Sequence, residues 1–321
     1  MFHHEPNRPS KASPAWISLQ PPAKILEEAD AAMTTLTLSD GAKINLTISG
    51  EGRPVVFVHG WAMHGGMFEP QHDALSKNYQ VISFDLRGHR HSASHDAAAT
   101  VERLGADLVE IFEQLNLQEA VCVGWSMGAM VAWEAMTQEI FARRVSGLVI
   151  IDMSPRISND ASWQLGLSDG RRPLAALRAA QAMRQDWPAM VHQFVPRIFS
   201  PNRKTNHGVH IAEMIEEANA LNAETMADLW ESMAVQDFRK TIRLLNIPTL
   251  VIYGEQSQLY PEATSQFVAS EIPNCEIASF PNSGHAPHLE EPDRFNERLI
   301  TFIEKLSSKT ISNTPFIVAA H

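Results

Sequence analysis

One serine in this chain stands in a sequence pattern that suits nucleophilic chemistry. Residues 124–128 read Gly-Trp-Ser-Met-Gly, after an apolar run at 120–123 and before a helix-favouring stretch at 129–136. A strand that turns into a helix at one residue strains that residue and leaves little room for side chains two positions away, which explains both glycines. The start of the helix also favours a developing negative charge. The pattern predicts that Ser126 is a nucleophile, although an ordinary serine in a glycine-containing turn would fit these five residues alone.

A nucleophilic serine needs a base that accepts its proton near neutral pH, and histidine is the usual choice. His285 lies in a loop at 281–287 that is rich in proline and glycine and follows the strand-like run at 276–280. Such a loop reaches the carboxyl edge of a parallel sheet, where Ser126 is expected. We therefore predict that His285 is the base, with a hydrogen-bonded loop histidine as the structural alternative. His288 competes, but its position near the start of the last helix favours a surface or capping role.

Two backbone N–H groups are expected to hold the negative charge that forms on a substrate oxygen. The short apolar run at 54–58 predicts a buried strand, and it leads into His-Gly-Trp-Ala-Met-His-Gly-Gly at 59–66. Glycines in that loop let the backbone approach a ligand closely. The loop after an early strand and the residue after the nucleophile usually supply the donors. We expect the N–H groups of Trp61 and Met127 to form this oxyanion hole, whereas a plain His-Gly turn is the alternative.

Together these segments resemble the α/β-hydrolase superfamily over residues 33–306. A strand-like run at 81–84 followed by Asp-Leu-Arg-Gly-His at 85–89 is similar to a turn of that family, although Arg-His-Ser at 90–92 replaces the usual Gly-x-Ser. The serine turn and the His-Gly-Trp segment look most like those of esterases related to pimeloyl-carrier-protein methyl ester esterases, and of cofactor-free haloperoxidases. The resemblance implies an α/β fold, with an eight-stranded, mostly parallel sheet and a helical cap inserted after the sixth strand.

The acid of the expected triad is displaced in this sequence. Most relatives carry an aspartate after the penultimate strand, but here that strand, 248–253, is followed by Gly-Glu-Gln-Ser, which puts Ser257 in the aspartate position. A hydroxyl can orient a neutral imidazole but cannot offset an imidazolium charge. The apolar run at 145–151 ends in Asp152, and the resemblance implies that this strand neighbours the penultimate one. We predict that Asp152 is the acid, with Glu255 as the alternative and a chain without a functional acid as the third possibility.

The domain boundaries follow from composition and from the resemblance. Residues 1–32 contain five prolines and scattered charges, without the apolar core of a signal peptide, and are expected to be a disordered extension. The rest divides into a core, a helical cap and a loose tail, at 33–152 with 241–306, at 153–240 and at 307–321 respectively. Met33 directly precedes a predicted β-hairpin, and whether translation starts there is left open.

Helical patterns dominate the expected cap. They cover residues 174–185, 188–199, 209–219 and 223–233. Its apolar side chains are mostly flexible, which suits an acyl pocket, although a plain helical core would use them too. They are Met183, Met190, Phe194, Met214, Met226, Trp230 and Met233. The first half is also basic, with Arg156, Arg171, Arg172, Arg178, Arg184, Arg197, Arg203 and Lys204. Such residues would bind a substrate carboxylate or an acidic carrier protein, and a solvated helix face is the alternative.

The composition argues against several other classes of protein. The net charge is −11, from 37 acidic and 26 basic residues, and the lack of a long basic run argues against nucleic-acid binding. No apolar segment reaches the length of a membrane span. Both cysteines lie in predicted strands, which fits a reducing cytoplasm without disulfides. The histidines lack the spacing of a metal site, so we expect neither metal nor cofactor, and we leave both a monomer and a homodimer open.

These predictions combine into a serine hydrolase that cleaves a small to medium carboxylic ester, free or carrier-linked, through an acyl-enzyme intermediate. Its triad would be Ser126, Asp152 and His285. A lactonase, a thioesterase or a perhydrolase would use the same residues, because a fold alone does not choose the reaction. A non-hydrolytic small-molecule receptor is the alternative from another class, and Ser257 in place of the usual aspartate is its only support.

Overall fold

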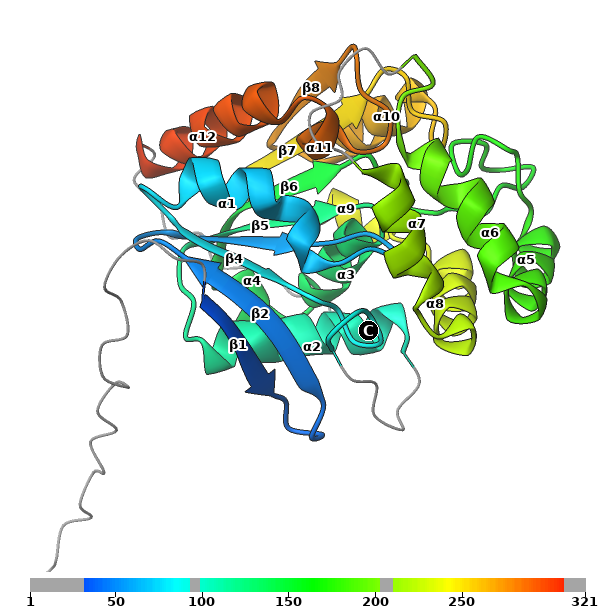
Figure 1. The fold of residues 1–321 in the computed structure, drawn as a ribbon. Helices are drawn as coiled ribbons and strands as arrows, with labels where there is room; N and C mark the ends of the chain where they lie inside the picture. Colours follow the sequence, from blue (N-terminus) through cyan, green and yellow to red (C-terminus); the bar gives the residue numbers. More distant parts are fainter. Residues whose placement is uncertain (1–31, 93–98, 203–209, 309–321) are drawn as a thin grey trace, which may run out of the picture.

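A central sheet of eight strands organises the computed structural model, which describes residues 32–92, 99–202 and 210–308 (Figure 1). In chain order the strands are β1 (Ala32–Thr37), β2 (Lys43–Ser49), β3 (Pro54–Val58), β4 (Gln80–Phe84), β5 (Ala120–Trp125), β6 (Val145–Ile151), β7 (Thr249–Gly254) and β8 (Cys275–Phe280). Their spatial order is β1-β2-β4-β3-β5-β6-β7-β8. The pairs β1–β2 and β2–β4 are antiparallel, and all the others are parallel. This confirms the predicted eight-stranded, mostly parallel sheet.

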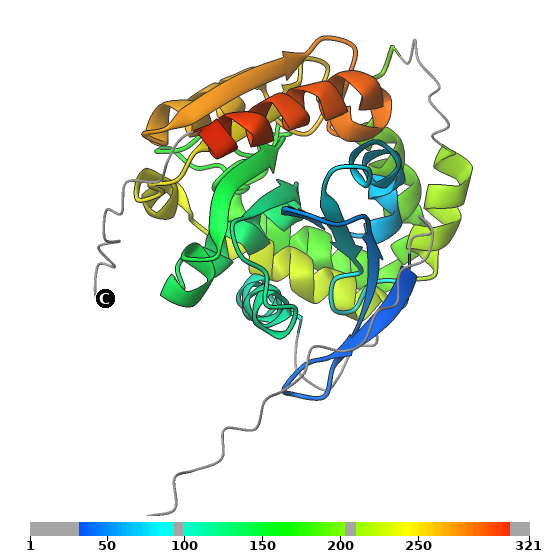
Figure 2. The same cartoon turned by 90° about the vertical axis from the view of Figure 1, so that its left-hand side faces the viewer.

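Helices cover both faces of the sheet, so its central strands are buried (Figures 1 and 2). Helices α1 (Glu69–Leu75) and α12 (Pro292–Ser308) pack together on one face, and α2 (Val101–Gln114) and α3 (Met127–Ala135) pack on the other. Every residue of β3, β5 and β7 is buried, and these strands are continuous apolar runs because both of their faces are covered. The other helices of this part are η1 (Gly65–Phe68), α4 (Glu139–Ala142), α9 (Arg239–Arg243), α10 (Glu262–Glu271) and α11 (Pro287–Glu290).

The segment between β6 and α9 forms the inserted helices. They are α5 (Pro173–Gln185), α6 (Trp187–Phe194), the 3-10 helix η2 (Val195–Ile198), α7 (Ile211–Asn219) and α8 (Ala223–Val235). They lie beyond the carboxyl ends of the parallel strands (Figure 1). The Trp61 ring, in the loop after β3, packs against Trp187, Phe194 and Trp230 at centroid distances of 5.4, 5.0 and 5.4 Å. Its indole N–H donates to the carbonyl of Met226 at 2.9 Å, so this loop is tied directly to the inserted helices. That these helices form a separate cap domain stays a prediction.

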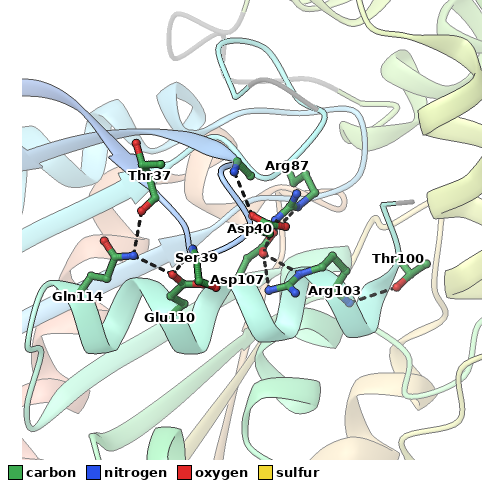
Figure 3. Close-up of polar contacts among 10 residues, drawn as sticks. Thr37, Ser39, Asp40, Arg87, Thr100, Arg103, Asp107, Glu110 and Gln114 are labelled. Carbon is green, nitrogen blue, oxygen red and sulfur yellow. Dashed lines mark hydrogen bonds and ion pairs between the residues drawn. The ribbon is translucent and has the colours of Figure 1, made fainter. Parts of the chain in front are cut away.

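A buried ion-pair network fixes the turn after β4 to α2 (Figure 3). The side chain of Arg87 is fully buried, and it donates to both carboxylate oxygens of Asp107 at 2.7 Å. It also lies 2.8 Å from Asp40 in the β1–β2 turn, while Arg103 donates to Asp107 from the same helix at 2.9 Å. Its hydrogen bonds with Asp107 raise the pKa of Arg87. The network therefore joins the β1–β2 hairpin, the turn at 85–89 and α2.

The first and last elements of the described chain, β1 and α12, can be compared with the predicted boundaries of the core. β1 begins at Ala32, so the expected extension at 1–32 lies outside the described residues except for its last one. Helix α12 runs to Ser308, two residues past the expected end of the core at 306, and the remainder of the predicted tail lies outside the described residues. Arg203 and Lys204 also lie outside them. None of the helices described is long and apolar enough to span a bilayer.

Candidate active site

Ser126 occupies a strained turn between β5 and α3. Its backbone has φ 54° and ψ −123°. A residue other than glycine in such a region carries about 1–3 kcal/mol of strain. The turn is also crowded, because a Cβ atom on Gly124 would lie 2.6 Å from Ala129 Cα and one on Gly128 would lie 2.0 Å from the carbonyl oxygen of Val58. Glycine is therefore required at both positions, as the sequence pattern predicts, and the turn holds Ser126 at the start of α3.

Four neighbouring parallel strands lead to the polar groups of the site. Ser126 follows β5, Asp152 follows β6, Ser257 lies just after β7 and His285 lies after β8. Since the carboxyl ends of parallel strands share one edge of a sheet, residues far apart in sequence converge there.

His285 and Asp152 form a buried hydrogen-bonded pair. His285 Nδ1 donates to Asp152 Oδ2 at 2.7 Å, and the two side chains are 1% and 2% exposed. The other ring nitrogen, Nε2, is buried and has no hydrogen-bond partner among the described residues. Because Nδ1 holds the proton against the carboxylate, Nε2 is the atom that can accept another proton.

The backbone of His285 is anchored on both sides. Its N–H donates to the carbonyl of Ile198 in η2 at 2.7 Å, and its carbonyl accepts from the Trp125 indole N–H at 2.8 Å. Trp125 directly precedes Ser126, so this bond ties the histidine loop to the serine turn. The rings of Trp125 and Tyr260 lie 5.9 and 5.7 Å from the imidazole, centroid to centroid. Burial raises the pKa of the Tyr260 phenol, which therefore stays neutral beside the pair.

Ser257 donates its hydroxyl to the same carboxylate oxygen, Asp152 Oδ2, at 2.6 Å. This serine stands where most relatives are expected to carry the aspartate, and here it contacts the carboxylate on the neighbouring strand. From the sequence, a hydroxyl at this position is expected at most to orient the imidazole, whereas in the structure it contacts Asp152. Glu255, the alternative acid, is exposed, and no hydrogen bond joins its carboxylate to His285. The geometry favours Asp152 over Glu255 as the partner of the imidazole.

The loop after β3 lies against the turn that carries Ser126. A Cβ atom on Gly60 would be 3.1 Å from Ser126 Cβ, so the loop backbone and the serine are in close contact. Trp61 and Met127 are both buried, and neither of their N–H groups has an acceptor within the described ranges. Two unengaged donors at this place support the predicted oxyanion hole, which stays a prediction.

Two buried histidines hold this loop in place. His59 Nε2 accepts from the N–H of Leu86 at 2.8 Å, and His89 Nε2 accepts from the N–H of Ala62 at 3.3 Å. Burial lowers the pKa of His59 well below its ordinary value and that of His89 to about 4, so both rings are neutral at pH 7 and keep an acceptor nitrogen. In the part of the chain that is described, no three His, Cys, Asp or Glu side chains gather in a way that could hold a metal ion.

A cavity of about 770 Å³, counted with its open mouth, is lined by Ser126, Trp61 and the inserted helices. Five of the flexible apolar residues singled out in the sequence line it: Met183, Met190, Phe194, Trp230 and Met233. Met214 instead lines a smaller cavity of about 240 Å³, and Met226 is buried in the core. The apolar wall suits the hydrocarbon part of a ligand.

The surface or capping role expected for His288 is wrong. Its side chain is fully buried and packs on Phe68, Trp125 and Phe295 at ring centroid distances of 4.9, 4.6 and 5.9 Å. Burial lowers its pKa to about 3, so the ring is neutral. The aromatic partners come from η1, β5 and α12, and local sequence carries no signal of that packing. His288 supports Trp125, which in turn holds His285.

Known proteins share this arrangement of elements. A model of the alpha/beta hydrolase family matches residues 55–298. A pimeloyl-[acyl-carrier protein] methyl ester esterase of Aliivibrio fischeri is 28% identical over 261 residues, covering 80% of this chain and 95% of that protein. The solved structure of an esterase from Exiguobacterium antarcticum has a TM-score of 0.77 and 23% identity, covering 84% of this chain and 99% of its own. A bromoperoxidase from Bacillus anthracis has a TM-score of 0.77 and 25% identity, covering 86% and 100%. The family match spans most of the chain and confirms the resemblance drawn from the motifs, and the chain therefore belongs to the alpha/beta hydrolase family.

Proposed function

We propose that this chain hydrolyses small to medium carboxylic esters through a covalent acyl-enzyme intermediate on Ser126. The observation that carries the proposal is the buried pair of His285 and Asp152, 2.7 Å apart, at the sheet edge that holds the strained serine turn. The name of the Aliivibrio fischeri relative states that it acts on a carrier-linked methyl ester, which supports an ester as substrate, free or carrier-linked.

In the first step His285 Nε2 takes the proton of the Ser126 hydroxyl while the serine oxygen bonds to the ester carbonyl carbon. The imidazole becomes positively charged, and Asp152 stabilises that charge across the 2.7 Å hydrogen bond. The carboxylate also fixes the tautomer, because it holds the proton on Nδ1. The neutral Tyr260 ring and the Trp125 ring limit the access of water to the charged pair.

The negative charge on the carbonyl oxygen is held by the backbone N–H groups of Trp61 and Met127. Both donors lie in buried, tightly bonded segments, so little reorganisation is needed when the charge forms. Losing one such donor typically costs about a hundredfold or more in turnover.

Collapse of this intermediate releases the alcohol, which takes the proton from His285, and leaves the acyl group on Ser126. A water molecule then gives its proton to Nε2 and attacks the acyl carbonyl, and a second collapse frees the acid and the serine. The apolar wall of the cavity accommodates the hydrocarbon part of the ester.

The hydrogen bond between Ser257 and Asp152 bears on the receptor alternative. That alternative depends on the loss of the usual aspartate. A carboxylate on the adjacent strand, supported by the serine that replaced the aspartate, favours a working hydrolase.

The test is hydrolysis of p-nitrophenyl acetate, butyrate and octanoate by the wild type and by Ser126→Ala. We expect the substitution to lower kcat by about a thousandfold or more, since serine and histidine act as a unit. Ser270→Ala is the matched control, because Ser270 is exposed on α10 and its hydroxyl donates to the Phe267 carbonyl in the same helix. Equal turnover by the wild type and Ser126→Ala would overturn the proposal.

A further inference from the structure

Two arginines line the cavity beside Ser126, and among the described residues one of them is paired with a carboxylate and the other is not. Arg171 donates to Asp169 through Nε at 3.2 Å and Nη2 at 2.8 Å, and its guanidinium lies 5.4 Å from the ring centroid of Trp230. Asp169 lines the same cavity, so this pair adds no net charge. Arg197 lines the cavity too, but none of the described carboxylates lies within 4.0 Å of its guanidinium.

The other basic residues of this region do not share the position of Arg197. Arg184 is paired with three carboxylates of α8, and Arg156 is paired with the aspartate four residues later. Arg172 and Arg178 are exposed to solvent. Within the described members of the basic group, Arg197 alone is partly buried, faces the cavity and has no carboxylate partner.

Hydrogen bonds join Arg197 and the two residues after it to the loop that carries Ser257 and to the loop that carries His285. Arg197 Nη2 donates to the carbonyl of Gln258 at 3.3 Å, and the side-chain amide of Gln258 donates to the carbonyl of Phe199 at 2.9 Å. The next residue, Ile198, accepts the N–H of His285 at 2.7 Å. The guanidinium is therefore held at a defined place relative to the reacting groups.

The chemistry of this position suits a carboxylate ligand. A guanidinium has five N–H donors in a planar fork, and the described residues engage Arg197 through one hydrogen bond. The fork matches the two oxygens of a carboxylate. The cavity wall is mostly apolar, which weakens screening by water and strengthens such a contact.

We propose that Arg197 binds an ionised carboxylate of the substrate, so that the preferred esters carry a second, charged carboxyl group. Half-esters of dicarboxylic acids carry it on the acyl side, and esters of hydroxy acids carry it on the alcohol side. The inference rests on the proposed ester hydrolysis and adds the substrate class.

The experiment compares kcat/KM for charged and neutral esters of equal length. Monomethyl esters of succinic, glutaric, adipic and suberic acid are paired with the corresponding dimethyl esters, and the acetate ester of 4-hydroxybutyrate is paired with that of its methyl ester. The enzymes are the wild type, Arg197→Gln, Arg197→Lys and the control Arg178→Gln, which changes an exposed arginine.

We expect Arg197→Gln to lower kcat/KM for the charged member of one series by about 10- to 100-fold, and that for its neutral partner by less than about threefold. Arg197→Lys is expected to lose less, since it keeps the charge without the fork. Arg178→Gln should match the wild type. The series that responds shows which side of the ester Arg197 faces, and the most affected chain length reports the span from Ser126.

Equal losses for charged and neutral esters, or no loss for either, would overturn the assignment of Arg197 while leaving ester hydrolysis intact. Failure of the proposed function looks different, because the wild type would then hydrolyse the neutral dimethyl esters no faster than Ser126→Ala. If Arg197→Gln does not fold, inhibition of wild-type p-nitrophenyl butyrate hydrolysis by glutarate decides the matter. Inhibition by glutarate and not by glutaramide supports the proposal, and equal effects of the two contradict it.

Discussion

Replacing Ser257 by alanine removes one of the two hydrogen bonds that the described residues donate to Asp152 Oδ2. The hydroxyl donates to this oxygen at 2.6 Å, and His285 donates to it at 2.7 Å. The substitution leaves the backbone and the His285 contact in place. It also removes two longer contacts, because the same serine oxygen accepts from the N–H groups of Leu259 and Tyr260 at 3.4 Å. The bond to Asp152 is the shortest of the three and the one to a charged group, so its loss is expected to dominate the effect.

The magnitude follows from the chemistry of that bond. A hydrogen bond to a charged group contributes about 1.5–3 kcal/mol. Every 1.36 kcal/mol lost from the transition state lowers the rate about tenfold. We therefore expect Ser257→Ala to lower kcat by about 10- to 150-fold. KM should change little, since Asp152 acts through His285 and not on the bound ester.

The assay is steady-state hydrolysis of p-nitrophenyl butyrate from pH 5 to 9, with Glu255→Gln as the control on the same loop. A kcat for Ser257→Ala within threefold of the wild type would refute the reasoning. A second variant exchanges the two residues, with Asp152→Ser combined with Ser257→Asp. It should be more active than Asp152→Asn alone, because a carboxylate returns to the position expected in most relatives.

Two further predictions concern stability. Arg87→Met leaves the buried Asp107 carboxylate without its main partner, and urea unfolding should show a loss of about 3–5 kcal/mol, whereas a loss under 1 kcal/mol would contradict a structural role for this pair. In the folded chain, burial lowers the pKa of His288 to about 3. As the pH falls below about 6.5, the unfolded chain therefore gains a proton that the folded chain does not. The free energy of unfolding decreases until the pH approaches the pKa of His288 in the folded chain. Between pH 7 and pH 5 this costs about 2 kcal/mol, and His288→Phe should reduce the measured pH dependence of unfolding by that amount; an unchanged dependence would show that His288 is charged or exposed in the folded chain.

The sheet, and the placing of Ser126, Asp152 and His285 at one edge of it, could be predicted because their signals are local. The glycines around Ser126 are dictated by contacts within one turn and its neighbouring strand. Asp152 and His285 each follow a parallel strand, and the sheet brings the carboxyl ends of such strands together. The pairing of Asp152 with His285 could be predicted because Asp152 directly follows a strand that neighbours the one before Ser257.

The rest depends on packing between distant segments, which local sequence does not record. His288 is buried by rings from three other elements, although its immediate neighbours are typical of a helix start. Nothing in the local sequence separates Arg197 from Arg184. In the folded chain, however, Arg184 is paired with three carboxylates of α8, about forty residues later in the sequence, and Arg197 is not. The direct contact between Ser257 and Asp152 crosses 105 positions. Such pairings required the folded arrangement of the inserted helices and the strand-end loops.

The rate at which a fluorophosphonate labels Ser126 tests the central claim most directly, because it reports activation of the serine without depending on the choice of ester. Mass spectrometry of the peptide that contains Ser126 gives this rate for the wild type, Asp152→Asn and Glu255→Gln. We predict one adduct on Ser126, labelling at least about a hundredfold slower in Asp152→Asn, and an unchanged rate in Glu255→Gln. Labelling of a different residue would contradict the role of Ser126. Labelling of Ser126 in Asp152→Asn at the wild-type rate would contradict the role of Asp152.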